Sequence, residues 1–493
     1  MSRISKVESR LRTEQDAVQH HLYADRLRIY PKSVRGPVRR IKWAILIACL
    51  TIYYVLPWVR WYRGPNQPSQ AVLLDLSTQR FYFFSLELWP QDIWLLAGIL
   101  IMAAVSLFLV TSLIGRVWCG YTCPQTVWTD LFMWIEREIE GDRNERMARD
   151  AAPLNADTIW KKVVKHGIWL FIAFWTGGAW IMYFVDAPTV TVDFWTGEAA
   201  TPVYVFTWLF TLTTYGLAGW AREQVCTYMC PWPRFQAAML DDQSFTVTYQ
   251  AWRGEPRLRG KRAEGGPAAG DCVDCSLCVT VCPTGIDIRD GIQLECINCG
   301  LCMDACNHVM ERTGRPKGLI AWDTLARQAA KKLGTHEPIR FFRPRTMIYV
   351  TALTIAVIGL STALLTRSTL GLSVLRDRAP LFVPLADGSL RNGYTLKIVN
   401  KSQTNGAYDL SISGLPDAKL AIAEGDTTPG STLRVLGSSD EVETFRLLVT
   451  ARPAALTDGS QPVDFILRDT TTGAQTVYHS VFMGPAGYAG GTR

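Results

Sequence analysis

Eight cysteines within 35 residues constrain this chain more than any other feature of its sequence. They form two successive Cys-x-x-Cys-x-x-Cys-x-x-x-Cys runs between Cys272 and Cys306. In bacterial ferredoxins such runs bind two iron–sulfur clusters, and the fourth cysteine of each run ligates the cluster of the other run. The spacing predicts one 4Fe–4S cluster on Cys272, Cys275, Cys278 and Cys306, and a second on Cys282, Cys296, Cys299 and Cys302.

A zinc module is the alternative interpretation of these cysteines. Zinc sites typically use paired Cys-x-x-Cys units with a longer spacer, so eight cysteines at this spacing favour iron. The last ~125 residues contain no cysteine, which differs from a disulfide-bonded secreted protein. We therefore expect the cysteine-rich part in a reducing compartment.

Five apolar stretches are long enough for helices that cross a membrane, which need about 20 predominantly apolar residues. They cover residues 43–59, 93–114, 163–185, 203–221 and 347–365. The basic arm that precedes them, residues 1–42, carries eleven Lys and Arg against four Asp and Glu. Such an arm can bind nucleic acid, but it leads directly into an apolar stretch. We interpret it as a flank that contacts membrane lipid, expect no nucleic-acid partner, and expect no cleavable signal peptide.

Loop charges predict how the chain is oriented. The connections 116–165 and 222–345 carry eight and 17 Lys and Arg, whereas 63–92 carries two and 186–202 carries none. Because Lys and Arg accumulate on the cytoplasmic side, the pattern predicts a multi-pass protein of the inner (cytoplasmic) membrane. Its N-terminus and cluster module would be cytoplasmic, and its C-terminal domain periplasmic.

Two further cysteine pairs repeat one short motif. Cys119/Cys123 and Cys226/Cys230 each form Cys-x-x-x-Cys-Pro after two apolar stretches, and the motifs lie 107 residues apart. The repeat indicates an internal duplication. Proline favours the first position of a helix, where the helix N-terminus would lower the pKa of Cys123. Two such thiolates can share a soft ion such as Cu(I) or form a disulfide. The alternative is a pair of buried structural thiols.

The C-terminal region has a different pattern, with short alternating runs between Gly, Asp, Asn and Pro breaks. Seven such runs predict a β-sandwich: 394–399, 408–412, 420–422, 432–435, 444–449, 463–467 and 477–481. The fold is therefore mixed and multidomain. After the arm come an α-helical membrane domain with four membrane helices (43–240), a linker (253–270), a ferredoxin-like two-cluster module (271–315), a fifth membrane helix (346–366) and the sandwich (370–493).

This order of elements resembles the cytochrome c oxidase accessory protein family called CcoG, FixG or RdxA. The similarity is carried by residues 119–125, 226–232 and 285–299, and extends from about residue 30 to 485. It implies a role in building a cbb-type oxidase, reduction of Cu(II) to Cu(I) for insertion into that enzyme, and an immunoglobulin-like terminal domain. The implied cofactors are two 4Fe–4S clusters and a transient copper ion.

The same resemblance places copper chemistry at the repeated motifs. Cys119, Cys123, Cys226 and Cys230 are the candidate catalytic and copper-binding residues. The implied partners are oxidase subunits, copper-handling assembly proteins and a cytoplasmic electron donor that the sequence does not identify.

Two other functions fit parts of the sequence. Membrane polyferredoxins share the repeated motif and the double cluster, and pass electrons from quinol to periplasmic reductases. This chain instead ends in a sandwich and has no flavin domain or dinucleotide motif. The third interpretation is a non-catalytic assembly scaffold whose sandwich binds a partner.

Overall fold

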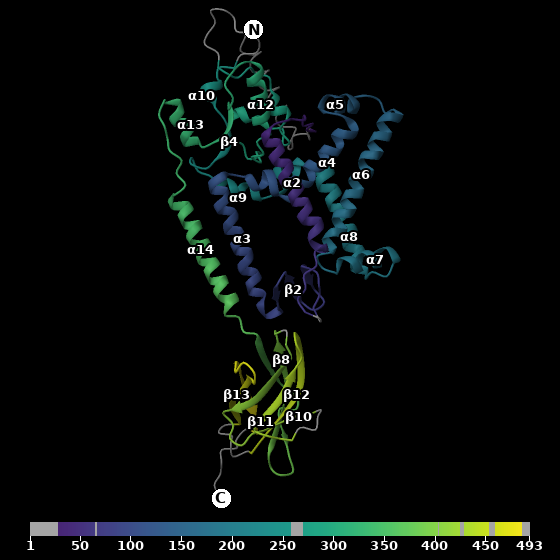
Figure 1. Ribbon diagram of the computed structural model, residues 1–493, viewed down its shortest axis with the longest axis vertical. Helices are drawn as coiled ribbons and strands as arrows, with labels where there is room; N and C mark the ends of the chain where they lie inside the picture. Colours follow the sequence, from purple (N-terminus) through teal and green to yellow (C-terminus); the bar gives the residue numbers. More distant parts are fainter. Residues whose placement is uncertain are drawn as a thin grey trace, which may run out of the picture. The chain divides into compact units, whose positions relative to one another are not determined.

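The computed structural model describes residues 28–64, 67–257, 270–402, 404–423, 428–452 and 459–485 (Figure 1). The chain divides into two compact units. One comprises Met1–Trp61 and Ser69–Leu360, and the other Tyr62–Pro68 and Ser361–Arg493. Most of the predicted basic arm and of the predicted linker lies outside the described residues.

Three helices among the described residues are long and apolar enough to cross a membrane. They span Pro37–Trp58, Pro90–Ile114 and Pro344–Leu365. These spans contain α2 (Pro37–Val55) with η1 (Leu56–Trp58), η2 (Pro90–Asp92) with α3 (Ile93–Ile114), and α14 (Pro344–Leu365). Their large apolar side chains are widely exposed, as expected for contact with lipid. The apolar helices indicate a membrane protein.

The other two predicted spans are also helical but differ in length and composition. They correspond to α6 (Ala156–Ile181) and α8 (Thr201–Thr214), which pack on each other and are joined by α7 (Ala187–Thr196). α8 has 14 residues before it passes into the π-helix η4 (Tyr215–Ala221), and α6 begins with a lysine-rich segment. By length and composition, three of the five predicted spans therefore meet the requirements for a helix that crosses a membrane.

Short elements connect the apolar helices. Between α2 and α3 lies an antiparallel sheet of β1 (Val72–Asp75), β2 (Arg80–Phe83) and β3 (Leu86–Leu88), which the sequence did not predict. The helices α4 (Pro124–Glu140) and α5 (Arg143–Ala151) precede α6. α4 places a row of buried side chains against α6 and η4.

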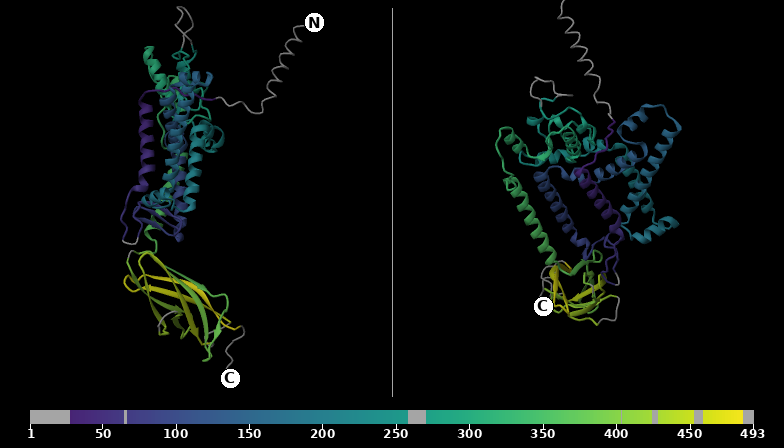
Figure 2. Two further views of the ribbon diagram at one scale, coloured as in Figure 1. Left: turned by 90° about the vertical axis from the view of Figure 1, so that its right-hand side faces the viewer. Right: turned by 45° about the horizontal axis from the view of Figure 1, so that its top comes forward.

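The cluster module is a compact layer of short elements (Figure 2). It contains β4 (Thr246–Tyr249), α10 (Ala251–Gly254), α11 (Leu277–Thr280), η6 (Ile288–Asp290), α12 (Leu301–Arg312), β5 (Ile320–Asp323) and α13 (Leu325–Lys332). β4 and β5 form an antiparallel pair. Val247, Met310 and Ile320 form a buried core together with Cys272 and Cys278, so the first cysteine run is built into the core of the module.

The C-terminal unit is a two-sheet sandwich. One sheet has the order β10-β12-β8-β6 with β7 beside β8, and the other has the order β11-β9-β13-β14. The strands are β6 (Leu370–Arg376), β7 (Val383–Pro384), β8 (Leu390–Asn400), β9 (Gly406–Ser413), β10 (Lys419–Ile422), β11 (Thr432–Gly437), β12 (Glu441–Ala451), β13 (Ser460–Asp469) and β14 (Gln475–Met483). All seven predicted runs lie in strands. Tyr394, Leu447 and Phe465 are fully buried between the sheets.

Candidate electron-transfer site

The fourth cysteine of the second run lies beside the first three cysteines of the first run. Burial, together with neighbouring thiolates of the first run, raises the pKa of Cys306 to about 12. These neighbours are Cys278, Cys272 and Cys275. The structure thus brings together the four thiols of the first predicted cluster, here called the first group.

Cys282, the fourth cysteine of the first run, lies beside the first three cysteines of the second run. Burial raises the pKa of Cys302 well above its usual value, and the largest electrostatic contributions come from three other thiolates. These are Cys299, Cys296 and Cys282. The four residues are called the second group. The grouping is the one that the predicted exchange of fourth cysteines requires.

The two runs fold as the same turn. Asp274 and Ser276, on either side of the second cysteine of the first run, have φ of 51° and 55°. Asn298 and Gly300, at the matching positions of the second run, have φ of 54° and 71°. This left-handed conformation is least costly for Gly, Asn and Asp. Three of these four positions therefore carry residue types that favour the turns that gather the thiols, and Ser276 is the exception.

The first repeated motif follows α3 and forms the π-helix η3 (Trp118–Thr122). Cys119 is buried, and its Sγ donates to Oε1 of Gln236 over 3.0 Å. Gln236 is itself fully buried and lies on α9 (Trp232–Met239), after the second motif. A hydrogen bond thus joins the first motif to the helix that follows the second motif.

The second motif has the same local structure. It forms the π-helix η5 (Val225–Met229), and Cys230 follows it directly, as Cys123 follows η3. Single π-turns are rare and concentrate at functional sites. Their occurrence at matching positions supports the internal duplication.

The two motifs bring four thiols together. Burial raises the pKa of Cys119 to about 12, and Cys123, Cys226 and Cys230 all add to the shift. Burial also raises the pKa of Cys226 to about 12, with further contributions from Cys123 and Cys230. All four are free thiols. We call these residues the four-thiol group.

The predicted lowering of the Cys123 pKa is wrong. Cys123 is the N-cap of α4 and Pro124 lies in its first turn, as predicted. Backbone N–H groups of Gln125 and Thr126 favour the thiolate, but burial raises the pKa of Cys123 by more. Removing a thiolate from water outweighs the helix N-terminus at this position.

The first motif packs directly on the loop of the second group. The hydroxyl of Tyr121 donates to the carbonyl oxygen of Cys299 over 3.1 Å. A Cβ added to Gly120 would lie 2.7 Å from the carbonyl oxygen of Ile297, so a side chain there would displace the loop. Cys119 lies in one apolar core with Cys299, and Cys226 and Cys302 pack against the same core.

Arg116 connects the same three parts of the chain. Its guanidinium donates to the carbonyl oxygens of Leu294 and Cys296, and over 2.9 Å to that of Pro233 on α9. It also interacts electrostatically with Cys119 and Cys296. This residue was not predicted from the sequence because all three carbonyls lie more than 100 residues away. Its position at the end of an uncharged apolar helix was the available signal.

A buried charge network surrounds Glu136 on α4. The carboxylate of Glu136 on α4 pairs with Arg146, Arg222 and Lys165 at 2.9, 3.0 and 3.3 Å. Burial alone would raise the pKa of Glu136, but these cations lower it to about 2. Arg222 lies four residues before Cys226, so the network fixes the approach to the second motif.

The cluster module also contacts the N-terminus of α2, the first apolar helix. Asp304 on α12 accepts hydrogen bonds from the backbone N–H of Val38 and of Arg39, over 3.3 and 2.8 Å. These are first-turn N–H groups of α2, which have no partner within the helix. Asp304, between Cys302 and Cys306, therefore caps α2. No local pattern predicted this contact.

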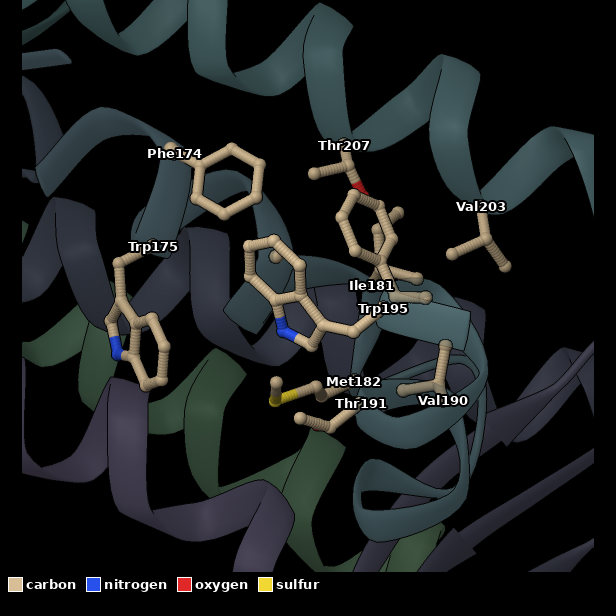
Figure 3. Close-up of a pocket in the computed structure, with 11 residues that line it drawn as sticks. Phe174, Trp175, Ile181, Met182, Val190, Thr191, Trp195, Val203 and Thr207 are labelled. Atoms are coloured by element: carbon tan, nitrogen blue, oxygen red, sulfur yellow. The ribbon is translucent and has the colours of Figure 1, made fainter. Parts of the chain in front are cut away.

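Other candidates do not join the site. Nδ1 of His166 lies 3.0 Å from the Tyr215 hydroxyl, and its ring stacks on Trp220. A pocket between α6, α7 and α8 is lined mainly by apolar side chains, including Phe174 and Trp195, with no thiol or titratable group (Figure 3). Within the described part of the chain, no three His, Cys, Asp or Glu side chains form a group suited to a single metal ion.

Comparison with known proteins places these features in a family. A 4Fe–4S dicluster domain matches residues 221–325, a 4Fe–4S binding domain matches 94–140, and the immunoglobulin-like fold at the C-terminus of FixG matches 360–485. The last match confirms the predicted type of sandwich, and the first supports iron–sulfur clusters.

Whole-chain relatives agree with the domain matches. The chain is 46% identical to nitrogen fixation protein FixG of Rhizobium meliloti, over 94% of each chain. It is 44% identical to protein RdxB of Cereibacter sphaeroides, over 96% of this chain and 99% of RdxB. It is 45% identical to protein RdxA of the same organism, over 91% of this chain and 93% of RdxA.

Proposed function

Because this chain belongs to the FixG family, we propose that its iron–sulfur clusters supply single electrons that reduce Cu(II) to Cu(I) during assembly of a cbb-type cytochrome c oxidase. The observation that carries this proposal is the packing of the four-thiol group against the second group. This packing would give an electron on the cluster module an adjacent acceptor site, formed by soft thiolate ligands.

The two groups of the module fit two 4Fe–4S clusters. Each supplies four thiols; among the eight residues Cys272, Cys278 and Cys299 are buried, and Cys275 is exposed. When bound, such clusters exchange one electron at a time, at potentials from about −700 to +450 mV. Since burial raises the pKa of Cys296 and of Cys306, these two thiols release protons when they bind iron.

Contacts along the chain support one route for the electron. α12 carries Cys302 of the second group and Cys306 of the first. The second group then meets the first motif through Cys299 and Tyr121. We propose that a cytoplasmic one-electron donor feeds the module and that the electron leaves through the four-thiol group.

Copper is the substrate in this scheme. Cu(II) takes one electron and becomes Cu(I), while one cluster is oxidised by one electron. Thiolates favour the softer product ion. Cys119, Cys123, Cys226 and Cys230 are therefore the residues at which we expect copper to receive the electron, as ligands or as neighbours of the ion.

The proposed sidedness does not depend on whether α6 and α8 cross the membrane. With three spans or with five, the basic connections 116–165 and 222–345 lie on the N-terminal side. The charge bias makes that side cytoplasmic. The sandwich then lies in the periplasm, where we propose that oxidase subunits and copper-handling assembly proteins are met.

The test uses the full chain, purified without oxygen in detergent, reduced and then given Cu(II). We expect one Cu(I), trapped by a Cu(I)-selective chelator, for each electron lost from cluster absorbance. Replacing all four thiols of the group by Ala should abolish Cu(I) formation and leave the iron of the eight-cysteine module bound. Cys49→Ala, which removes a free thiol on α2, is the matched control. Unchanged Cu(I) formation in the fourfold variant would exclude this site.

A further inference from the structure

A cationic cavity lies between the N-terminal end of α2 and the middle of α4, two helices that pack on each other (Figure 1). Its volume is about 770 Å³, and four arginines line it against two acidic residues. The arginines are Arg35, Arg39, Arg40 and Arg137, and the acids are Glu138 and Asp142. A concave surface with a surplus of positive charge attracts an anionic ligand.

The nearby carboxylates are already engaged elsewhere. Both carboxylate oxygens of Asp142 accept hydrogen bonds from Ser33, from its backbone N–H over 2.9 Å and from its hydroxyl over 2.7 Å. The buried Asp130 pairs with Arg39 at 2.7 Å and also with Lys42 at 3.4 Å. One carboxylate thus serves two cations, and the surplus of positive charge persists around the cavity.

Arg137 lies among other cations. Its side chain is half-buried, and its Nε donates to the carbonyl oxygen of Met133, one turn earlier on α4, over 3.2 Å. Within the described ranges of the chain, no carboxylate forms a direct ion pair with it. Burial and the neighbouring Arg39 and Arg146 lower the pKa of Arg137, and two carboxylates offset only part of this effect. A partly buried cation in such surroundings is stabilised by an anion that joins it.

The same cavity has an aromatic side that continues into an apolar one. Trp43 of α2 and Trp134 of α4 both line it, and their rings pack edge to face with centroids 5.7 Å apart. Tryptophan is enriched where a membrane meets water. Ile47 follows Trp43 by one turn on the same face of α2 and is 57% exposed. Cationic, aromatic and apolar side chains thus succeed one another along a helix that is suited to cross a membrane.

We propose that this cavity binds the phosphate group of an anionic phospholipid, with Arg35, Arg40 and Arg137 as hydrogen-bond donors. Guanidinium groups match phosphate oxygens in charge and geometry. Basic pockets beside membrane helices on the cytoplasmic side suit anionic headgroups, and the charge bias puts the start of α2 on that side. An acyl chain of the lipid lies along the exposed apolar face of α2.

The apolar face distinguishes a lipid from a soluble phosphate compound. Both offer the same oxygens to the arginines, but only a lipid also covers Trp134 and Ile47, which are 41% and 57% exposed. Covering apolar surface adds to the affinity. The inference is independent of copper reduction, because neither the lipid nor the arginines take part in the proposed electron route.

Native mass spectrometry of the full chain, released from detergent micelles at increasing phosphatidylglycerol, provides the test. We expect one phosphatidylglycerol molecule to bind more tightly than phosphatidylcholine does. Arg40→Gln combined with Arg137→Gln should weaken this binding about 30-fold, from the electrostatic contribution of two arginines to an anionic lipid. Arg234→Gln combined with Arg312→Gln removes the same charge from two exposed arginines elsewhere. This matched control should keep the affinity of the unaltered chain.

Thermal unfolding of the same proteins separates loss of binding from loss of folding. Because Arg137 lies among cations, the Arg40/Arg137 variant should unfold at no lower temperature than the unaltered chain when no lipid is added. Phosphatidylglycerol should raise the unfolding temperature of the unaltered chain and not that of the variant. Arg35→Gln combined with Arg40→Gln changes only exposed side chains, and should also weaken binding even if the other variant proves unstable.

Three results would overturn the lipid site. The first is equal affinity of the unaltered chain for phosphatidylglycerol and phosphatidylcholine. The second is an equal loss of affinity in the cavity variants and in the matched control. The third is the same stabilisation by inorganic phosphate, compared with chloride at equal ionic strength, which would assign the cavity to a soluble anion.

Discussion

The two Cys-x-x-x-Cys-Pro motifs form the same π-turn in different surroundings. The first is packed against the cluster module, with Gly120 and Tyr121 in contact with the loop of the second group. At the matching positions of the second motif stand Thr227 and Tyr228, and Tyr228 is 80% exposed. The two motifs therefore differ in their central residues, which contact the loop of the second group in the first motif and include the exposed Tyr228 in the second, although Cys226 packs against the same core.

The openness of the second motif concerns access to the thiols. Met229, next to Cys230, is 63% exposed, and a thioether is a soft ligand that suits Cu(I). The first motif has Thr122 at this position. From this difference we expect the first motif to accept the electron and the second motif to face the copper ion.

The largest expected effect tests whether the two motifs act as one unit. Cys119→Ala and Cys226→Ala should each lower the rate of Cu(I) formation by at least about tenfold, and the double variant should be no worse than either. Stopped-flow detection of the chelated Cu(I) measures the rates. Losses that multiply in the double variant would mean that the motifs act independently.

The next prediction tests whether the ion pairs of Glu136 stabilise the second motif more than the first. Glu136→Gln leaves Arg146 and Arg222 without their shared carboxylate, and breaking a buried ion pair costs about 3–5 kcal/mol. We expect a lower thermal unfolding temperature and faster hydrogen exchange at residues 222–230 than in the first motif. Glu138→Gln, on an exposed residue of the same helix, is the control. Equal exchange in both motifs would contradict the assignment of this network to the second one.

The same carboxylate sets a pH window. The pKa of Glu136 is lowered from 4.5 to about 2, so its contribution to stability is complete above about pH 4.5 and is lost as the pH falls through about 2. Between pH 8 and 5 this group should not change the unfolding temperature. The check is the difference in unfolding temperature between the unaltered protein and Glu136→Gln, measured across that pH range. A difference that decreases between pH 8 and 5 would contradict the prediction.

A smaller effect is expected where the first motif meets the module. In Gly120→Ala the new Cβ meets the Ile297 carbonyl at 2.7 Å, and such overpacking typically costs about 1–3 kcal/mol. We expect slower electron transfer to copper with the two module clusters intact. Thr227→Ala is the matched change in the second motif and should have little effect. The comparison fails if the two variants have the same rate.

The smallest effect tests a single hydrogen bond. Tyr121→Phe removes the donor to the carbonyl oxygen of Cys299, which is worth about 1 kcal/mol. We expect a modest loss of stability and a small shift in the potential of the second cluster, measured by redox titration followed by EPR. Tyr228→Phe should change neither quantity. A shift of the same size in that control would remove the distinction between the motifs.

Much of the fold could be predicted from local patterns. The spacing of the eight cysteines predicted which thiols come together, and alternation predicted seven strands of the sandwich. Short elements with weak patterns, such as β1 to β3, were missed. The number of membrane spans depended on α6, which begins with a lysine-rich segment, and on α8, where the helix changes type at Tyr215.

The site was predicted less completely because its supporting residues act over long distances in the sequence. Gln236, Arg116 and Asp304 each contact groups that lie more than 100 residues away. The Cys123 pKa was predicted in the wrong direction because the sequence shows the helix N-terminus but not the depth of burial. Motifs can be read locally, whereas the charges that surround them depend on the tertiary structure.

The cap on α2 has a consequence for how the protein is made. Asp304 follows Arg39 by 265 residues, so the ribosome delivers the first apolar helix to the membrane long before its capping carboxylate exists. Domains form in order during synthesis, and this helix end stays uncapped until the second cysteine run has folded. Completion of the metal-binding module is thereby coupled to the stability of α2, which makes the intact cap a physical marker of a fully matured chain.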